Sequence, residues 1–289
     1  MKRFFPALFA FFFAQSVTAE PLVWQAQKGE LTYTLMGSVH LGKPDFYPLP
    51  NVIESRFRQA DALIVEADVI NDTQITFPQG KPTSELVDST QRDALATIAK
   101  ELGYPESVLL NMPPWQTAMV LQLAQSQTLE LQQALGIDLH FLSRTKNLNI
   151  PVKTFETVQE QIDLLAGTGD HGLALLDDTL THWALSKEFM PCLIEAWHVG
   201  DNEKMTTIVD EMGDASDFER KLLIDRNINW IKMLTDSAQM PKGEYVVIVG
   251  ALHLPGEEGL LTLLNNKGFT ITPLNQGQKA DCELPEFPS

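Results

Sequence analysis

The chain has 289 residues and a formal net charge of −17 at neutral pH, because 38 acidic residues outnumber 21 basic ones. A surface this negative repels nucleic-acid phosphates and anionic lipid headgroups, which excludes nucleic acid as a partner. The acidic residues are scattered along the sequence, so solubility alone explains most of them. A chain of this length can bury one large core, and we expect one domain with an insertion.

The first 19 residues have the pattern of a secretory signal peptide. Two basic residues precede an apolar run over residues 4–13, and small residues up to Ala19 form the expected cleavage site. The apolar run is shorter than the roughly 20 residues that a permanent membrane span needs. We therefore expect cleavage near Ala19, a mature chain of residues 20–289 with no stable membrane span, and a periplasmic or secreted location in a bacterium.

The same short pattern, a histidine three residues after a glycine at the end of an apolar β-like run, occurs near both ends of the mature chain. A predicted β-hairpin over residues 22–36 leads into His40, and a predicted strand over residues 245–249 leads into His253. Functional sites in α/β folds usually lie at strand ends. We expect the first and last β segments to be neighbours, so that both imidazoles face one site.

Two neutral imidazoles at one rim are suitable ligands for a divalent cation. With only two histidines, such a cation keeps positions open for water and a carboxylate, as a catalytic site requires. A single glycine-x-x-histidine pattern is also compatible with a structural, hydrogen-bonded histidine. His171, His182 and His198 are interpreted as packing or surface residues, and His140, two residues after Asp138 at a predicted helix start, is a weaker candidate that is not included in the site.

One acidic residue, Glu66, interrupts the apolar run over residues 62–67, which has the length of a strand. A carboxylate in such a run is costly unless it is paired, hydrogen-bonded or bound to a metal. The alternative is an edge-strand glutamate that faces water. Beside two strand-end histidines, Glu66 is predicted to be a general base or a carboxylate ligand.

Helical periodicity dominates residues 90–240, and a short predicted strand over residues 151–155 interrupts it. A projection of the last helix places Arg226 and Asn227 in its apolar sectors. Buried arginine and asparagine side chains need partners, which a cleft holding an anion, a metal-bound carboxylate or a substrate carbonyl would supply. The alternative is a structural ion pair between Arg226 and Glu219, one heptad earlier.

The two cysteines, Cys192 and Cys282, lie far apart in the sequence. In an oxidising compartment they can form a disulfide that ties the C-terminal tail to the helical middle. Two unpaired thiols are the alternative, because sequence does not show whether the Cβ atoms meet. We do not expect this pair to bind a metal, since no other cysteine or histidine stands at zinc-finger spacing.

These motifs together resemble the TraB/PrgY/GumN family, to which the Tiki metalloproteases of animals are related. The resemblance rests on the two glycine-x-x-histidine segments, on Glu66 and on the helix motif at residues 225–227, and it covers nearly the whole mature length. Residues 136–138 and 155–157 resemble the GumN-like bacterial branch. Asp225 stands where many relatives have glutamate, which leaves the role of the arginine intact and puts that of the neighbouring acid in doubt.

The resemblance implies both a fold and a chemistry. The fold is expected to be α/β, similar to erythromycin esterase and ChaN-like proteins, with a central mixed sheet built from N- and C-terminal segments, flanked by helices, and a large helical insertion over about residues 90–240. The implied activity is that of a metal-dependent hydrolase, and Tiki relatives are peptidases that use manganese or cobalt. Zinc is a further candidate cofactor.

We therefore predict a Tiki-like metallopeptidase that acts on a peptide or another small-molecule substrate. His40 and His253 would hold one divalent cation, and Glu66 would be a further ligand or would orient or deprotonate the bound water. Arg226 would stabilise the oxyanion and Asn227 would order the pocket. The alternative is a non-catalytic protein that binds haem or a polysaccharide intermediate on the same scaffold.

Overall fold

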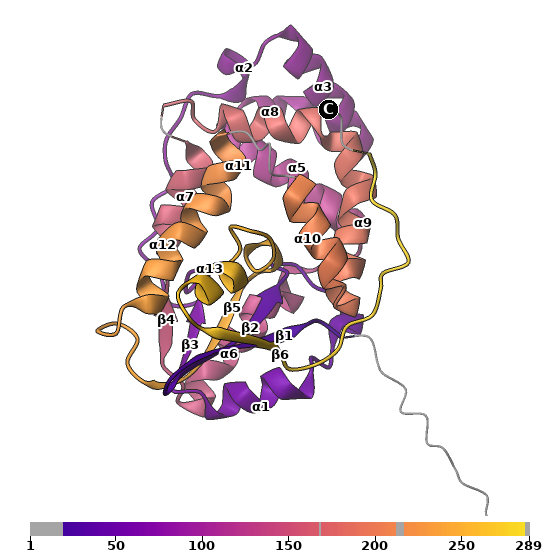
Figure 1. Ribbon diagram of the computed structural model, residues 1–289. Helices are drawn as coiled ribbons and strands as arrows, with labels where there is room; N and C mark the ends of the chain where they lie inside the picture. Colours follow the sequence, from indigo (N-terminus) through magenta and orange to yellow (C-terminus); the bar gives the residue numbers. More distant parts are fainter. Residues whose placement is uncertain (1–19, 168, 212–216, 287–289) are drawn as a thin grey trace, which may run out of the picture.

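A computed structural model of the protein describes residues 20–286, apart from residue 168 and residues 212–216. The predicted signal peptide, residues 1–19, lies outside the described part. Helices surround a single sheet, and further helices form a separate layer beyond one end of it (Figure 1). In the part of the chain that is described, no helix combines the length and the apolar character needed to cross a membrane.

The sheet is mixed and has the strand order β4-β3-β5-β2-β1-β6. Its strands are β1 (Val23–Lys28), β2 (Leu31–Ser38), β3 (Ala62–Val65), β4 (Val152–Thr154), β5 (Gly243–Gly250) and β6 (Thr270–Pro273). β1 pairs antiparallel with both β2 and β6, whereas β4, β3, β5 and β2 run parallel. The predicted central mixed sheet, built from both chain ends and flanked by helices, is confirmed.

The strands that precede the two histidine motifs are direct neighbours in this sheet. In the parallel pair of β2 and β5, Gly37 lies opposite Val249 and Ser38 lies opposite Gly250. Gly37 has no room for a side chain, because an added Cβ would lie 2.8 Å from the Cα of Ala251. The two motifs therefore leave the sheet at the same edge, with the backbones in close contact.

The helices follow four of the strands along the chain. One helix, α1 (Asn51–Gln59), connects β2 to β3. Between β3 and β4 lie α2 (Thr83–Leu86), α3 (Ser89–Leu102), α4 (Glu106–Leu110), α5 (Pro114–Thr128) and α6 (Ile137–Leu148). Between β4 and β5 lie α7 (Val158–Ala166), α8 (Leu173–Thr181), α9 (Trp183–Val199), α10 (Asn202–Glu211), α11 (Asp217–Leu222) and α12 (Ile224–Thr235), and α13 (Leu260–Asn266) follows β5. Because β4 returns to the sheet within residues 90–240, the description of this whole stretch as one insertion remains an interpretation.

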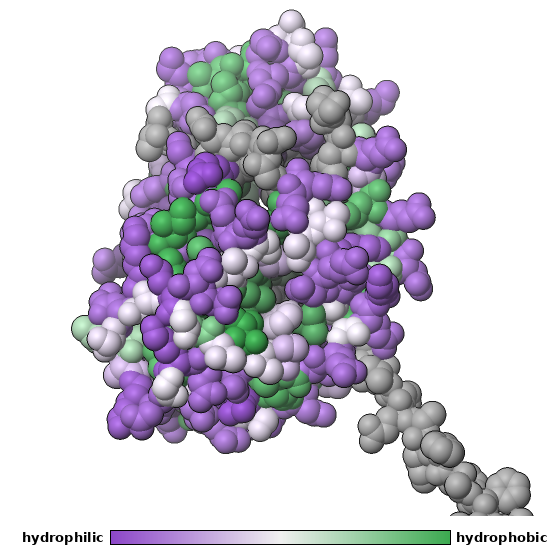
Figure 2. All heavy atoms as spheres, viewed as in Figure 1, coloured by the Kyte–Doolittle hydropathy of each residue, from purple (hydrophilic) through white to green (hydrophobic). Residues whose placement is uncertain are grey.

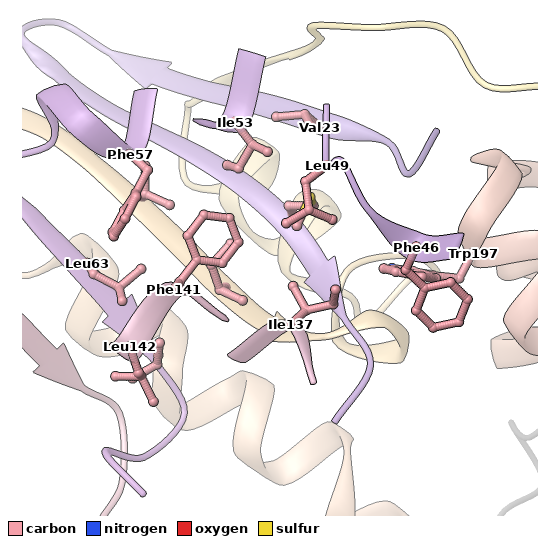
Figure 3. Packing of buried hydrophobic residues seen from close by; sticks show 14 of the residues in the cluster. Val23, Phe46, Leu49, Ile53, Phe57, Leu63, Ile137, Phe141, Leu142 and Trp197 are labelled. Atoms are coloured by element: carbon pink, nitrogen blue, oxygen red, sulfur yellow. The ribbon is translucent and has the colours of Figure 1, made fainter. Parts of the chain in front are cut away.

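Alternation along the strands creates a core on each face of the sheet. In β5, Val246 and Ile248 pack on one face and Val247 and Val249 on the other, as the period of two in a strand requires. The first core includes aromatic and aliphatic side chains of α1 and α6 (Figure 3). The second core includes side chains of α12 and α13. This packing fixes α6 and α12, the two helices that carry site residues, against opposite faces of the sheet.

A third core holds the separate helical layer together. It is formed by apolar side chains of α3, α4, α5 and α8, with Trp183 at the start of α9. Hydrophilic residues cover most of the visible surface, as the composition leads one to expect (Figure 2). The molecule therefore has a sheet-based half and a helical half, each with its own buried apolar cluster.

The two cysteines form a disulfide, which decides between the alternatives that the sequence left open. Cys192 lies on α9, and Cys282 lies in a C-terminal segment that has no regular secondary structure. Lys204 of α10 donates hydrogen bonds to the carbonyl oxygens of Ala280 and Cys282, and Asp201 accepts one from the backbone N–H of Ala280. The tail is thus attached to α9 and α10 by both covalent and polar contacts.

Candidate functional site

Three strand ends bring the predicted site residues to one edge of the sheet. β2 ends at Ser38, two residues before His40; β3 ends at Val65, just before Glu66; and β5 ends at Gly250, three residues before His253. Parallel strands present their carboxyl ends on the same side, so these residues gather at the edge that faces the helical half (Figure 1).

Glu66 is buried, with 5 % of its surface exposed, and its carboxylate is hydrogen-bonded on both oxygens. Oε1 accepts from the backbone N–H of Gly250 at 2.7 Å. Oε2 accepts from Arg226 at 2.5 Å and from Gln161 at 3.1 Å. Burial acts to raise the pKa of Glu66, but the interactions with His253 and Arg226 outweigh it and lower the pKa to about 2. The edge-strand alternative is wrong, because β3 is an interior strand and this carboxylate does not face water.

The backbone at Gly250 explains why glycine is needed beside Glu66. An added Cβ would lie 3.2 Å from Oε1 of Glu66 and 3.4 Å from Cδ2 of His253. A side chain here would press on both groups, whereas glycine leaves room for its own N–H to reach the carboxylate. The glycine of the second motif therefore joins Glu66 and His253 in one compact arrangement.

Arg226, on the first turn of α12, is the cation of the site. Its Nε donates to Glu156 at 2.9 Å, and its Nη2 donates to Glu156 at 3.0 Å and to Glu66. Its Nη1 donates to the carbonyl oxygen of Leu222 at 3.1 Å. The guanidinium also lies over the ring of Trp230, 4.7 Å from the ring centroid. Two carboxylates thus hold a single arginine between β3, β4 and α12.

The predicted inward orientation of Arg226 and Asn227 is confirmed. The Arg226 side chain is 14 % exposed and Asn227 is 1 % exposed. The side chain of Glu219, the alternative partner, lies outside the described part. The carboxylates that contact Arg226 belong to Glu66 and Glu156.

His253 is buried, and Asn227 determines which of its ring nitrogens carries the proton. The amide NH₂ of Asn227 faces two carbonyl oxygens, those of His253 and Glu258. The amide oxygen is therefore the atom 2.7 Å from Nδ1 of His253, and it accepts a hydrogen bond from the N–H of that nitrogen. Nε2 is left with its lone pair, 3.3 Å from Nη1 of Arg226. Burial lowers the pKa of His253 to about 3, so the ring is neutral near pH 7.

His40 lies in different surroundings, with 67 % of its side chain exposed. Its Nδ1 lies 2.9 Å from Oδ2 of Asp138, whose Oδ1 accepts a hydrogen bond from Ser38. The hydrogen bond with Asp138 is the main reason that the pKa of His40 is raised to about 9. The charge of Glu66 also acts to raise this pKa, and the charge of Arg226 acts to lower it.

α6 supplies Asp138 because its first turn packs directly on the His40 segment. The N–H of Ile137 donates to the carbonyl oxygen of Val39, and a Cβ added at Gly136 would lie 2.2 Å from the carbonyl oxygen of His40. The sequence interpretation did not include Asp138 in the site, although residues 136–138 were noted for their family likeness.

Glu156 and its neighbours were also not predicted as site residues. Glu156 accepts a hydrogen bond from Nε1 of Trp230 at 2.8 Å, and the Trp230 ring lies 4.3 Å from the His253 ring. Thr157, the next residue, caps α7 through reciprocal hydrogen bonds with Glu160. The signal that could have found Glu156 is its position directly after the predicted strand over residues 151–155, whereas Glu66 was predicted as a carboxylate within an apolar run.

The donor atoms of the site have the chemistry that a divalent cation requires. Each imidazole is held at Nδ1 by an oxygen partner, as metal-binding histidines usually are. Nε2 of His253 lies 3.7 Å from Oε1 of Glu66. Among the described residues, however, no three His, Cys, Asp or Glu side chains gather closely enough to hold a metal ion. The cation that contacts both His253 and Glu66 is the guanidinium of Arg226.

Comparison with known proteins supports the sequence resemblance. The TraB/PrgY/gumN family model matches residues 22–273. The uncharacterized protein YbaP of Escherichia coli (strain K12) is 37 % identical over 238 residues, which cover 82 % of this chain and 89 % of YbaP. The YbaP protein of Shigella flexneri is 38 % identical over 232 residues, which cover 80 % of this chain and 86 % of that protein. No solved structure matches the chain.

Proposed function

The chain belongs to the TraB/PrgY/gumN family, and from this premise and the chemistry of the site we propose that it is a divalent-metal-dependent hydrolase of the bacterial periplasm, acting on peptide bonds. The observation that carries the proposal is the pairing of His253 and Glu66. The unprotonated Nε2 of a neutral imidazole lies 3.7 Å from a buried, ionised carboxylate, and both contact the same arginine. This combination suits a site that binds a cation and polarises a carbonyl group.

The residues that would hold the cation are His253, Glu66 and His40, and His40 would first have to lose the proton that its pKa of about 9 keeps on the ring near pH 7. When bound, the metal would supply Lewis-acid polarisation and a bound water of lowered pKa, with manganese or cobalt preferred and zinc as a further candidate. A base with a pKa of about 2 has little driving force to accept a proton near pH 7. The role of ligand and orienting group therefore suits Glu66 better than that of general base.

The remaining residues of the site hold these donors in place. Asn227 fixes the tautomer of His253, whereas the carboxylate of Asp138 orients the His40 ring at Nδ1 and favours its protonated form. Arg226 brings a positive charge to the position where a substrate oxyanion would develop, beside Glu66. Glu156 holds this arginine from the far side.

The proposal is tested with protein purified without chelator. Elemental analysis gives the metal content, and a peptide library then reports cleavage with added manganese, cobalt or zinc. We expect metal-dependent cleavage that a chelator abolishes and that Glu66→Gln or His253→Ala reduces about 100-fold or more. Glu54→Gln is the matched control, because Glu54 also pairs with an arginine, Arg144, but outside the site, and its cleavage rate should be unchanged.

Two results would contradict the proposal. Full cleavage by metal-free protein would refute the dependence on metal. Binding of peptide or haem with no cleavage under any of the three metals, and with Glu66→Gln indistinguishable from wild type, would favour the non-catalytic alternative.

A further inference from the structure

The segment between β3 and α2 carries a group of exposed apolar side chains close to the site. It begins directly after Glu66, and residues 72–82 have no regular secondary structure. Four of its large apolar side chains are between 36 % and 55 % exposed: Val69, Ile70, Ile75 and Phe77. Clustered apolar side chains on a surface mark a place where a partner binds, whereas scattered single ones are ordinary.

The side chain of Gln159, on the first turn of α7, holds this segment at Thr76. Its Oε1 accepts from the N–H of Thr76 at 2.7 Å, and its Nε2 donates to the carbonyl oxygen of the same residue at 2.9 Å. Paired residues of antiparallel strands exchange two bonds in the same way. The chain at Thr76 is therefore extended, and the amide of Gln159 takes the place of a neighbouring strand on this side.

The opposite side of the extended chain is open. Neighbouring residues of an extended chain turn their N–H and C=O groups to opposite sides, so those of Ile75 and Phe77 point away from Gln159. Within the part of the chain that the structure describes, these groups have no hydrogen-bond partner. An unpaired edge of this kind is a template for an added strand.

The side chains at this open edge are apolar and supported from beneath. Ile75 and Phe77 lie on the same face of the extended chain, because side chains alternate with a period of two. The Phe77 ring stacks on that of Trp115, with 6.1 Å between the ring centroids, and Trp115 is itself 6 % exposed. The edge therefore combines free main-chain groups with an apolar face on a buried base.

We propose that residues 75–77 bind an extended, apolar stretch of the substrate polypeptide as an added strand, at a subsite beside the candidate site. The role of this polypeptide as substrate rests on the proposed function. Pairing with the main chain of Ile75 and Phe77 supplies affinity, and contact with their side chains supplies specificity. A polypeptide fits better than an anionic membrane surface, which the net charge of −17 repels.

α7 connects this subsite to the candidate site as it leads from the sheet to the helical half (Figure 1). Gln161, two residues after Gln159, donates to Oε2 of Glu66 at 3.1 Å. Residues two apart on a helix project about 200° apart, so the subsite and Glu66 lie on opposite sides of this first turn. A helix is about 10 Å across, which about three extended residues span. We therefore expect the paired stretch of the substrate to lie about three or more residues from the scissile bond.

The test is the binding of a fluorescein-labelled peptide of alternating valine and threonine, measured by fluorescence anisotropy with a chelator present. Phe77→Ser removes the most exposed apolar side chain of the segment and should weaken binding by about 10-fold. Ile75→Ser should weaken it in the same direction. Leu148→Ser is the matched control, because Leu148 is 40 % exposed but lies on α6, and its affinity should equal that of wild type. Wild-type affinity in both Phe77→Ser and Ile75→Ser would overturn the inference.

A modified peptide tests the main-chain pairing separately. The same sequence with every backbone amide N-methylated keeps its side chains but has no N–H to donate. It should bind wild type about 10-fold more weakly or worse, because the hydrogen bonds to the open edge are lost. Equal binding of the two peptides would overturn the inference.

Other occupants of this surface would give different results. Wild type that sediments with phosphatidylcholine vesicles and does not bind the peptide would assign the segment to a membrane. A dimer that Phe77→Ser dissociates, again without peptide binding, would assign it to a second copy of the chain. Either result would overturn the inference.

Kinetics separate this inference from the proposed function. Phe77→Ser should raise KM for a long peptide and leave kcat unchanged, and it should not affect a peptide too short to reach residues 75–77. Cleavage of long peptides with wild-type KM in Phe77→Ser would overturn the inference and leave the proposed function intact. Binding at this segment without cleavage under any of the three metals would support the peptide site and refute the proposed function.

Discussion

His40 and His253 follow the same local pattern, yet they have opposite environments. His40 is mostly exposed and has a carboxylate, Asp138, at Nδ1. His253 is buried and has a neutral amide, Asn227, at the same nitrogen. The pKa is accordingly raised to about 9 for His40 and lowered to about 3 for His253.

The difference shows what a repeated motif does and does not specify. The pattern places both imidazoles at neighbouring strand ends, because β2 and β5 pair in parallel. The charge of each ring depends on the residue that approaches from another element, α6 for His40 and α12 for His253. In the metal-free protein the two histidines are therefore unlike in charge, although they are alike in sequence.

The dependence of stability on pH should separate the two histidines most clearly. The unfolded chain protonates His253 near pH 6.5 but the folded protein resists this down to about pH 3, so stability falls as the pH drops below 6.5. For His40 the folded pKa is the higher one, so its contribution is complete below pH 6.5 and is lost as the pH rises through about 9.

Urea unfolding across this range measures both effects in one series. We expect a maximum in the free energy of unfolding near pH 6.5. The decrease toward lower pH is the acid limb of this profile, and the decrease toward higher pH is the alkaline limb. His253→Asn should flatten the acid limb between about pH 5 and 6.5, above the range where carboxylates titrate, and His40→Asn should flatten the alkaline limb. An acid limb that persists unchanged in His253→Asn would show that the burial of this ring is not its cause.

The partners of the two rings should differ in their effect on stability. Asn227→Ala leaves a buried Nδ1–H and two carbonyl oxygens without a partner, which should lower the free energy of unfolding by about 1–3 kcal/mol. Asp138→Ala is the matched change at His40. Because the His40 ring is exposed to water, Asp138→Ala should lower the free energy of unfolding by less than about 1 kcal/mol. Equal losses in the two variants, by chemical denaturation at pH 7, would contradict the contrast in burial.

The most local change is Asp138→Asn, which removes one charge and nearly no volume. The pKa of His40 should fall from about 9 toward its ordinary value of 6.5, since the hydrogen bond to the carboxylate is the main cause of the shift. NMR titration of the ring protons measures this directly, and the His253 signals serve as an internal control. A His40 pKa that stays near 9 in this variant would mean that a group other than the Asp138 carboxylate raises it.

The features that could be read from the sequence are those with a short-range period or a fixed local signature. Apolar runs of strand length identified β2 and β5, and the 3.6-residue period placed Arg226 and Asn227 in apolar sectors of their helix. The single carboxylate in an apolar strand identified Glu66. Each of these signals is carried by neighbouring residues, so no knowledge of the rest of the fold was needed.

The partners of these residues were decided by packing between distant segments. Glu156 follows β4 and meets α12, which brings it to Arg226, whereas the predicted helix offered Glu219, one heptad earlier in the sequence. Asp138 reaches His40 because α6 packs on the loop after β2, and the Cys192–Cys282 disulfide forms because the tail runs along α9 and α10. Periodicity carries no information about which helix face meets which strand end. Hydrogen bonds and charges act over a few ångströms, so only the folded arrangement determines the ionisation and the partners of the site.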